Sequence, residues 1–125
     1  MFSVHTSPLA QPGAGDGGGM NVYVRALASS LARAGVACDV FTRAESPTQP
    51  TVVDVEPGFR VVHVEAGPRA TVAKRELPEL IEPFVERARR AMESEAPYDV
   101  LHANYWLSGG VAHSLKHQLD VPLAA

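Results

Sequence analysis

A glycine-rich stretch near the start of the chain most constrains what the chain can fold into. Five of the seven residues from 13 to 19 are glycine, a short apolar run around Val4 precedes them, and an amphipathic pattern over residues 20–34 follows. Glycine has no Cβ, so it leaves backbone N–H groups open to a ligand. A helix N-terminus adds unpaired N–H donors and a positive dipole end. This order predicts an anion site, most often for phosphate, although a loop whose glycines only serve a turn is the alternative.

Strand and helix patterns alternate along the rest of the chain. The patterns predict strands over residues 2–6, 36–42, 52–55, 59–64, 99–104 and from 121 onward, with helices over 20–34, 77–92 and 107–119. The two strands around Pro57-Gly58 fit an antiparallel hairpin, although a continued parallel order also fits. The alternation predicts an α/β fold, a Rossmann-like and mostly parallel sheet with flanking helices.

Two prolines complicate the helix predicted over residues 77–92. Pro78 suits a position in the first turn. Pro83 would cost about 3 kcal/mol inside a helix because it removes a backbone hydrogen bond. The helix therefore either kinks at Pro83 or begins its regular part there.

Length, charge and cysteine content restrict the class of protein. The chain has 125 residues, which allows at most one domain, and a formal net charge of −3 gives no general attraction to nucleic acid or anionic membranes. No apolar run approaches the roughly 20 residues of a membrane span, and no basic-then-apolar leader precedes the first strand. These absences predict a cytoplasmic protein. Cys38, the single cysteine, is expected to be a small core residue.

Ligands of doubly wound sheets bind at the carboxyl ends of the strands. The glycine stretch falls at such an end, and so do four other polar groups: His5, Arg43, Asn104 and Tyr105. The sequence therefore predicts that these groups belong to one site.

Several kinds of chemistry fit the residues poorly. Residues 13–18 match the dinucleotide fingerprint G-x-G-x-x-G, but residues 7–12 separate them from the strand, and Arg43 ends the second strand where an acid is required. A nicotinamide-nucleotide-binding module is therefore a minor alternative. No Gly-Lys-Ser/Thr follows the glycines, no His/Cys cluster has metal-ligand spacing, and no serine lies in a nucleophile elbow. Neither a metal nor a cofactor is predicted.

Two segments of the chain resemble the N-terminal domain of glycosyltransferase family 4. They are SVHTSPLAQPG at residues 3–13 and GGMNVYV at residues 18–24. Weaker segments follow in the order that the family shows, namely VFTR at 40–43, AGP at 66–68, Lys74 with Leu77-Pro78, and His102 with YWLSG at 105–109. The resemblance covers essentially the whole chain and is greatest for members that glycosylate inositol phosphate in the mycothiol pathway.

The resemblance implies a GT-B enzyme, which has two Rossmann-like domains with a cleft between them, needs no metal and retains the anomeric configuration. Residues 1–125 would be its N-terminal, acceptor-side domain, incomplete and without the C-terminal donor domain. The enzyme would transfer a sugar, most often N-acetylglucosamine, from a UDP-sugar to an inositol phosphate. Another sugar-phosphate or a lipid-linked acceptor is the alternative. The resemblance also leaves room for a homodimer of the full-length enzyme.

The last strand pattern in the sequence also leads us to expect that the domain is incomplete. A sheet that stops inside the strand begun at residue 121 would leave an apolar edge exposed. The chain is therefore expected to be part of a longer protein, and the 125 residues alone are expected to be inactive.

The resemblance also implies roles for particular residues, although it identifies no catalytic one. The acceptor would be bound by His5, Asp16, Gly17, Gly18, Gly19, Met20 and Asn21, with its phosphate held by Lys74 and Tyr105. The uridine nucleotide of the donor would lie beside Gln11 and Pro12, and its diphosphate near Gly19.

Each of these residues also has an alternative without a ligand. His5 could cap neighbouring backbone, Lys74 could be solvated, and Tyr105 could belong to the core. Asn21 could be a polar surface residue. Two departures from the family matter: Asn104 replaces the histidine of many relatives, and residues 69–76 differ in length and content.

Overall fold

The structure is a computed structural model. It describes residues 1–5, 7–9, 20–95, 97–103, 105–119 and 121–124. The elements follow in the order α1 (Met20–Arg33), β1 (Cys38–Arg43), β2 (Val52–Glu56), β3 (Phe59–Val64), the 3₁₀ helix η2 (Lys74–Leu80), α2 (Ile81–Glu93), β4 (Leu101–His102), α3 (Tyr105–Leu119) and β5 (Leu123–Ala124).

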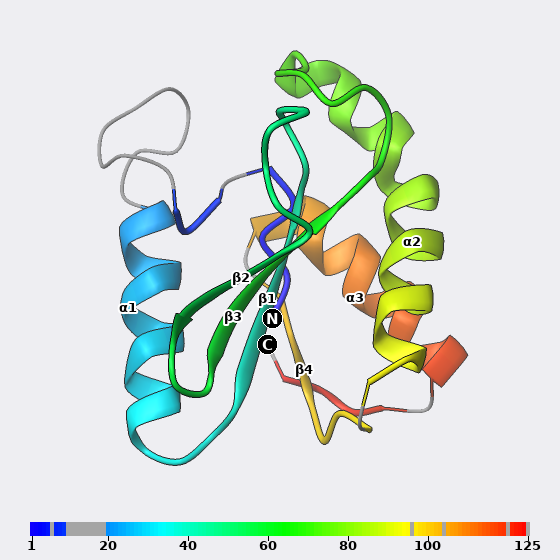
Figure 1. Cartoon of the computed structure of the whole chain (residues 1–125). Helices are drawn as coiled ribbons and strands as arrows, with labels where there is room; N and C mark the ends of the chain where they lie inside the picture. The colour runs from blue at the N-terminus through cyan, green and yellow to red at the C-terminus, as the bar shows by residue number, and fades with distance from the viewer. Residues whose placement is uncertain (6, 10–19, 96, 104, 120, 125) are drawn as a thin grey trace.

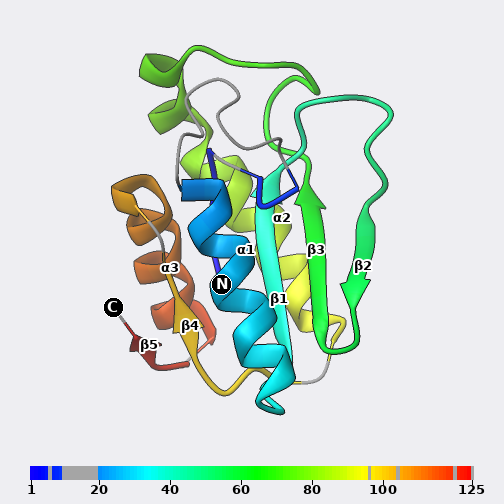
Figure 2. The ribbon, with the colours of Figure 1, turned by 90° about the vertical axis from the view of Figure 1, so that its left-hand side faces the viewer.

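The first residues of the chain join two small sheets. One sheet has the order β1-β3-β2, with β1 parallel and β2 antiparallel to β3, and the other is the parallel pair β4-β5. Phe2 forms parallel bridges to Phe41 of β1 on one side and to Ala103, just after β4, on the other. We call residues 1–4 the central segment. The described strands therefore lie in the order β2-β3-β1-central segment-β4-β5 (Figure 2).

Helices cover both faces of this sheet, with α1 on one face and α2 and α3 on the other (Figure 1). Side chains alternate between the faces along a strand. Val40 of β1 accordingly belongs to a core cluster with Val24 and Ala28 of α1. The next residue, Phe41, belongs to the opposite cluster, which contains Phe84 of α2. These two cores confirm the predicted Rossmann-like α/β fold.

All the parallel strands end at the same edge of the sheet, which we call the carboxyl edge. The helices α1 and α3 begin there, and η2 leads into α2 on the same side (Figure 2). The opposite edge, where β1 begins, is called the amino edge. This arrangement gathers helix N-termini at the carboxyl edge, as the sequence predicted.

The turns of the structure decide two predictions about connections. β2 and β3 form the predicted antiparallel hairpin, so a continued parallel order is wrong. Gly58 in their turn has φ +85°, and Gly35 after α1 has φ +89°. Glycine adopts such values without strain because it has no Cβ, so Gly35 ends α1 as predicted.

The prolines of the second helical region are placed differently from the prediction. Pro78 lies inside η2 and not in the first turn of α2. Pro83 is the third residue of α2, which begins at Ile81. The first four N–H groups of a helix have no partner within it. Pro83 therefore removes no hydrogen bond from within α2, and neither predicted alternative describes its place fully.

Other expected elements are shorter than predicted or shifted. The first strand is reduced to the bridge at Phe2, while β4 and β5 have two residues each. Cys38 is a free, buried cysteine, as predicted. Within the described ranges, no helix combines the length and apolar character that crossing a membrane requires.

Candidate functional site

Asn21 lies in the first turn of α1 and is buried, with 1% of its surface exposed. It lines a groove of about 560 Å³ that also includes Pro8 and extends along α1 to Arg33. The alternative of a polar surface residue is therefore wrong. A buried carboxamide at a helix N-terminus offers both a donor and an acceptor, which suits recognition of a hydroxyl group.

His5 follows the central segment at the carboxyl edge and is half-buried. Two hydrogen bonds fix the backbone just before it. The N–H of Val4 donates to the hydroxyl oxygen of Ser108 over 2.9 Å, and the N–H of Arg43 donates to the carbonyl of Val4 over 3.3 Å. Ser108 belongs to α3 and is fully buried. The position of His5 therefore depends on both α3 and β1.

Arg43 lies at the carboxyl edge, as predicted, but its guanidinium binds the protein backbone. Its Nη1 donates to the carbonyls of Ala66 (3.3 Å) and Pro68 (2.7 Å), and its Nη2 donates to that of Ala70 (2.6 Å). Only 2% of Arg43 is exposed. Burial lowers the pKa of the guanidinium, while the nearby Glu45 raises it. Arg43 therefore holds the segment after β3.

The structure locates the remaining predicted residues only in part. Met20, Lys74 and Tyr105 begin α1, η2 and α3, so their backbones are placed. Lys74 precedes the helix predicted over residues 77–92 and begins the 3₁₀ helix η2. The other predicted positions lie outside the described residues: Gln11, Pro12, Asp16, Gly17, Gly18, Gly19 and Asn104.

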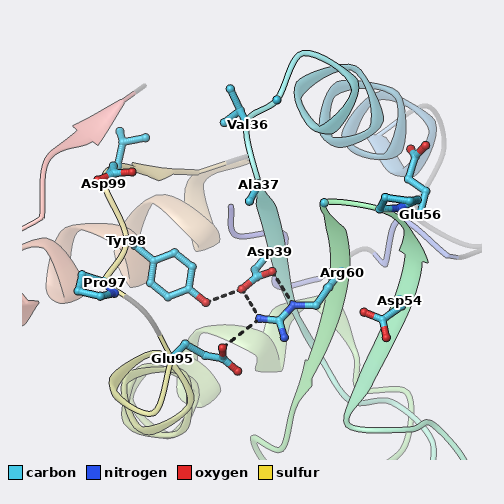
Figure 3. Close-up of a pocket in the computed structure, with 14 residues that line it drawn as sticks. Val36, Ala37, Asp39, Asp54, Glu56, Arg60, Glu95, Pro97, Tyr98 and Asp99 are labelled. Carbon is cyan, nitrogen blue, oxygen red and sulfur yellow. Dashed lines mark hydrogen bonds and ion pairs between the residues drawn. The ribbon is translucent and has the colours of Figure 1, made fainter.

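A cavity of about 1040 Å³ lies at the amino edge, away from these residues. Figure 3 shows Asp39, Arg60 and Tyr98 turned toward one another in it. The guanidinium of Arg60 donates to both carboxylate oxygens of Asp39, over 2.9 and 2.7 Å, and the hydroxyl of Tyr98 donates to Oδ2 of Asp39 over 2.5 Å. Oε2 of Glu95 lies 3.5 Å from Nη2 of Arg60.

Asp39 and Arg60 form an ion pair in this cavity. Burial alone would raise the pKa of Asp39, but the hydrogen bonds from Arg60 and Tyr98 outweigh it and hold the pKa below its usual value. Burial and the hydrogen bond to Asp39 raise the pKa of Tyr98. Near neutral pH, Asp39 is thus charged and Tyr98 is a hydroxyl donor. The cluster joins β1, β3 and the segment before β4, so we assign it a structural role.

Sequence reasoning missed the cluster of Asp39, Arg60 and Tyr98. Arg60 and Tyr98 lie 21 and 59 positions after Asp39 in the chain. The one available signal was an acid inside the otherwise apolar strand pattern of residues 36–42. Across the part of the chain that the structure describes, no group of three or more His, Cys, Asp or Glu side chains could hold a metal ion.

Comparison with protein families decides the family of this chain. The family described as "Glycosyl transferase 4-like domain" matches residues 18–125. The chain belongs to this family. The family predicted from the opening motifs is therefore confirmed.

Individual relatives agree with this assignment. A D-inositol 3-phosphate glycosyltransferase of Xylanimonas cellulosilytica is 53% identical over 125 residues, which cover 98% of this chain and 30% of that protein. The protein of the same name from Corynebacterium diphtheriae is 48% identical over 124 residues, which cover 98% of this chain and 29% of that protein. The chain thus spans about 30% of the length of these relatives.

A solved structure also matches the fold. Sucrose-phosphate synthase from Thermosynechococcus elongatus superimposes with a TM-score of 0.91 at 38% identity, over 98% of this chain and 30% of that chain. This match confirms the predicted Rossmann-like fold of a GT-B glycosyltransferase domain.

Proposed function

We propose that this chain is the N-terminal, acceptor-side domain of a retaining GT-B glycosyltransferase and that it binds an inositol phosphate at its carboxyl edge. The whole enzyme would transfer a sugar, N-acetylglucosamine in the first instance, from a UDP-sugar to a hydroxyl group of the acceptor. The name D-inositol 3-phosphate glycosyltransferase, carried by relatives about half identical to this chain, supports the acceptor.

The observation that carries the proposal is the convergence of polar groups at the carboxyl edge. The starts of α1 and α3 meet there with the end of the central segment (Figure 2). Asn21 is buried in the first turn of α1, and His5 follows the central segment. This edge is where ligands bind in open α/β sheets.

Binding of the phosphate requires several groups together. One helix N-terminus contributes about 0.3–2 kcal/mol toward an anion, whereas micromolar affinity requires roughly 8 kcal/mol. We therefore assign the acceptor phosphate to Lys74 and Tyr105 in addition to backbone N–H groups. Lys74 supplies a full charge that helix dipoles lack.

The other predicted residues complete the proposed site. Asn21 would recognise a hydroxyl group of the inositol ring, with His5 beside it. The backbone N–H groups of Gly18 and Gly19 would face the acceptor and the donor diphosphate, and Gln11 with Pro12 would lie beside the uridine. The negative charge that develops on the leaving diphosphate must be neutralised by positive groups. We assign most of those groups to the C-terminal domain of the whole enzyme.

A different sugar-phosphate acceptor is the second candidate. The observation that favours it is the structural match to a protein named sucrose-phosphate synthase. Both candidates use the same edge and the same phosphate contacts, so they differ only in the groups that recognise the ring.

Titration of the ¹⁵N-labelled chain, followed by NMR, tests the proposal. D-inositol 3-phosphate should shift amide signals at the starts of α1, η2 and α3, and should bind more tightly than glucose 6-phosphate or NADP. Lys74→Ala should weaken binding about tenfold, the loss of one charge-assisted contact. Lys116→Ala changes an exposed lysine in the last turn of α3 and should leave binding unchanged.

The same titration can refute the proposal. Shifts confined to the amino edge, or tighter binding of NADP, would exclude an inositol phosphate site at the carboxyl edge. Tighter binding of glucose 6-phosphate would favour the second candidate.

A further inference from the structure

We propose that Arg43 is a positioning residue for the acceptor phosphate, because it fixes the segment that brings Lys74 to the carboxyl edge. This inference rests on the proposed function. It assigns to Arg43 a role that requires no contact with either substrate.

The first argument is the burial of the Arg43 charge. A buried guanidinium loses its hydration, which costs free energy unless its N–H groups find other acceptors. Within the described residues, the hydrogen bonds of the Arg43 guanidinium go to backbone carbonyls, those of Ala66, Pro68 and Ala70. The carbonyl of Ala66, a buried residue, in turn needs a donor, since a buried backbone group without a partner is also costly. The guanidinium and the segment thus stabilise each other.

The second argument is the geometry of arginine. The guanidinium carries five N–H donors in a planar fork, so that it can reach three carbonyls spread over residues 66–70. A lysine ammonium is a compact point charge on a flexible stem. Lysine at position 43 would keep the charge but lose the simultaneous contacts to both ends of residues 66–70.

A second attachment holds the same segment farther along the chain. Gly67 has φ +72°, and a Cβ there would lie 2.7 Å from Cδ2 of Leu80 at the end of η2. Leu77 of η2 is buried, with 5% exposed. The stretch from residue 66 to residue 80 is therefore held by Arg43 near its start and by η2 packing near its end.

Lys74 lies between these two attachments. Lys74 is four positions after Ala70, so the two Cα atoms can be at most about 14 Å apart. With Ala70 bound to Arg43 (Nη2 to carbonyl oxygen, 2.6 Å), Lys74 stays within reach of the end of β1. Releasing Ala70 would remove the hydrogen bond between this segment and Arg43 that lies nearest to Lys74 in the chain.

Direct contact of Arg43 with the anion is the competing explanation. Its Nε is buried and makes no hydrogen bond within the part of the chain that the structure describes. If Arg43 only positions Lys74, it affects phosphate binding only while Lys74 is present. If Arg43 contacts the anion directly, it affects binding whether or not Lys74 is present. A double-mutant cycle between the two residues separates these cases.

The test uses the 125-residue chain with Arg43→Lys, Lys74→Ala and the double variant, and Arg87→Lys, an exposed arginine on α2, as the matched control. Hydrogen exchange of the amides of residues 66–74 and the Kd for D-inositol 3-phosphate are measured. Arg43→Lys should speed exchange there about tenfold, since local opening becomes easier, and raise the Kd about fivefold or more. The double variant should bind no more weakly than Lys74→Ala alone, and the control should match the native chain.

Two results would overturn the positioning role. One is native exchange and native Kd in Arg43→Lys. The other is a double variant that binds more weakly than Lys74→Ala, because it would show direct contact of Arg43 with the anion. Absence of binding by the native chain would refute the proposed function instead, and the exchange of residues 66–74 alone would then decide whether Arg43 fixes the segment.

Discussion

The backbone N–H of Val4 donates to the hydroxyl oxygen of Ser108 over 2.9 Å, between two buried residues that are 104 positions apart in the chain. Val4 ends the central segment, and Ser108 lies in the first turn of α3. A serine on a helix thus accepts a hydrogen bond from the backbone of the central segment, next to His5. This contact therefore links the core, to which Val4 belongs, with the candidate site that includes His5.

Ser108→Ala should destabilise the chain by about 1–3 kcal/mol, because the buried N–H of Val4 would lose its acceptor. Chemical denaturation measures this loss. Ser114→Ala makes the same change on the same helix at a half-buried position, and its effect should stay within about 0.5 kcal/mol. Equal effects of the two variants would show that the contact to Val4 contributes little.

Asp39→Asn should lower the free energy of unfolding by about 1.5–3 kcal/mol near neutral pH, since it weakens hydrogen bonds to a charged group. The folded-state pKa of Asp39 lies below its unfolded value. Its charge therefore stabilises the fold above the unfolded pKa, about 3.9, and this contribution disappears as the pH falls through the folded-state pKa. The difference between native and variant chains should shrink below about pH 4.

The control for this prediction is Asp54→Asn, which changes an exposed carboxylate on β2. It should alter the unfolding free energy by less than about 0.5 kcal/mol. A gap between native chain and Asp39→Asn that is constant from pH 7 to pH 2 would contradict the assigned pKa direction.

Gly67→Ala should destabilise the chain more than Gly35→Ala does. Both glycines have positive φ, but a Cβ at Gly35 would meet no atom within 4 Å, whereas one at Gly67 would lie 2.7 Å from Leu80. The left-handed conformation costs an alanine about 1–2 kcal/mol at either site. Displacing the half-buried Leu80 side chain should add to this cost at Gly67 alone. Thermal unfolding compares the two, and adding Leu80→Ala to Gly67→Ala should remove the excess if the contact with Leu80 causes it.

The local elements were predictable because each has a local physical cause. The apolar periodicity of residues 20–34 predicted α1, and Gly35 after it supplies the positive φ that ends a helix. The central segment was harder, because its order depends on partners that are distant in sequence. Phe2 pairs with Phe41 and Ala103, and no pattern within residues 2–6 reports those contacts.

The places of the candidate site residues in the fold were easier to predict than their contacts. The rule that parallel strands end at one edge correctly grouped His5, Arg43 and the start of α3. It did not reveal that Arg43 donates to backbone carbonyls. Those carbonyls belong to residues after β3, which come close to Arg43 only in the folded chain. The Asp39 cluster escaped prediction for the same reason.

The 125-residue chain alone should transfer no sugar from UDP-N-acetylglucosamine to D-inositol 3-phosphate. Under the proposed function, the groups that neutralise the leaving diphosphate belong to the C-terminal domain. Mass spectrometry of the reaction mixture detects any glycosylated product. Robust product formation by these residues would refute the proposed division of labour between the two domains.

The most direct test of the account is a crystal structure of the chain with D-inositol 3-phosphate. The account predicts the ligand at the carboxyl edge, with its phosphate within hydrogen-bond distance of Lys74 and its ring hydroxyls near Asn21. The three hydrogen bonds of Arg43 to residues 66–70 should be intact. A ligand bound instead in the cavity beside Asp39 and Arg60, at the amino edge, would contradict the central claim.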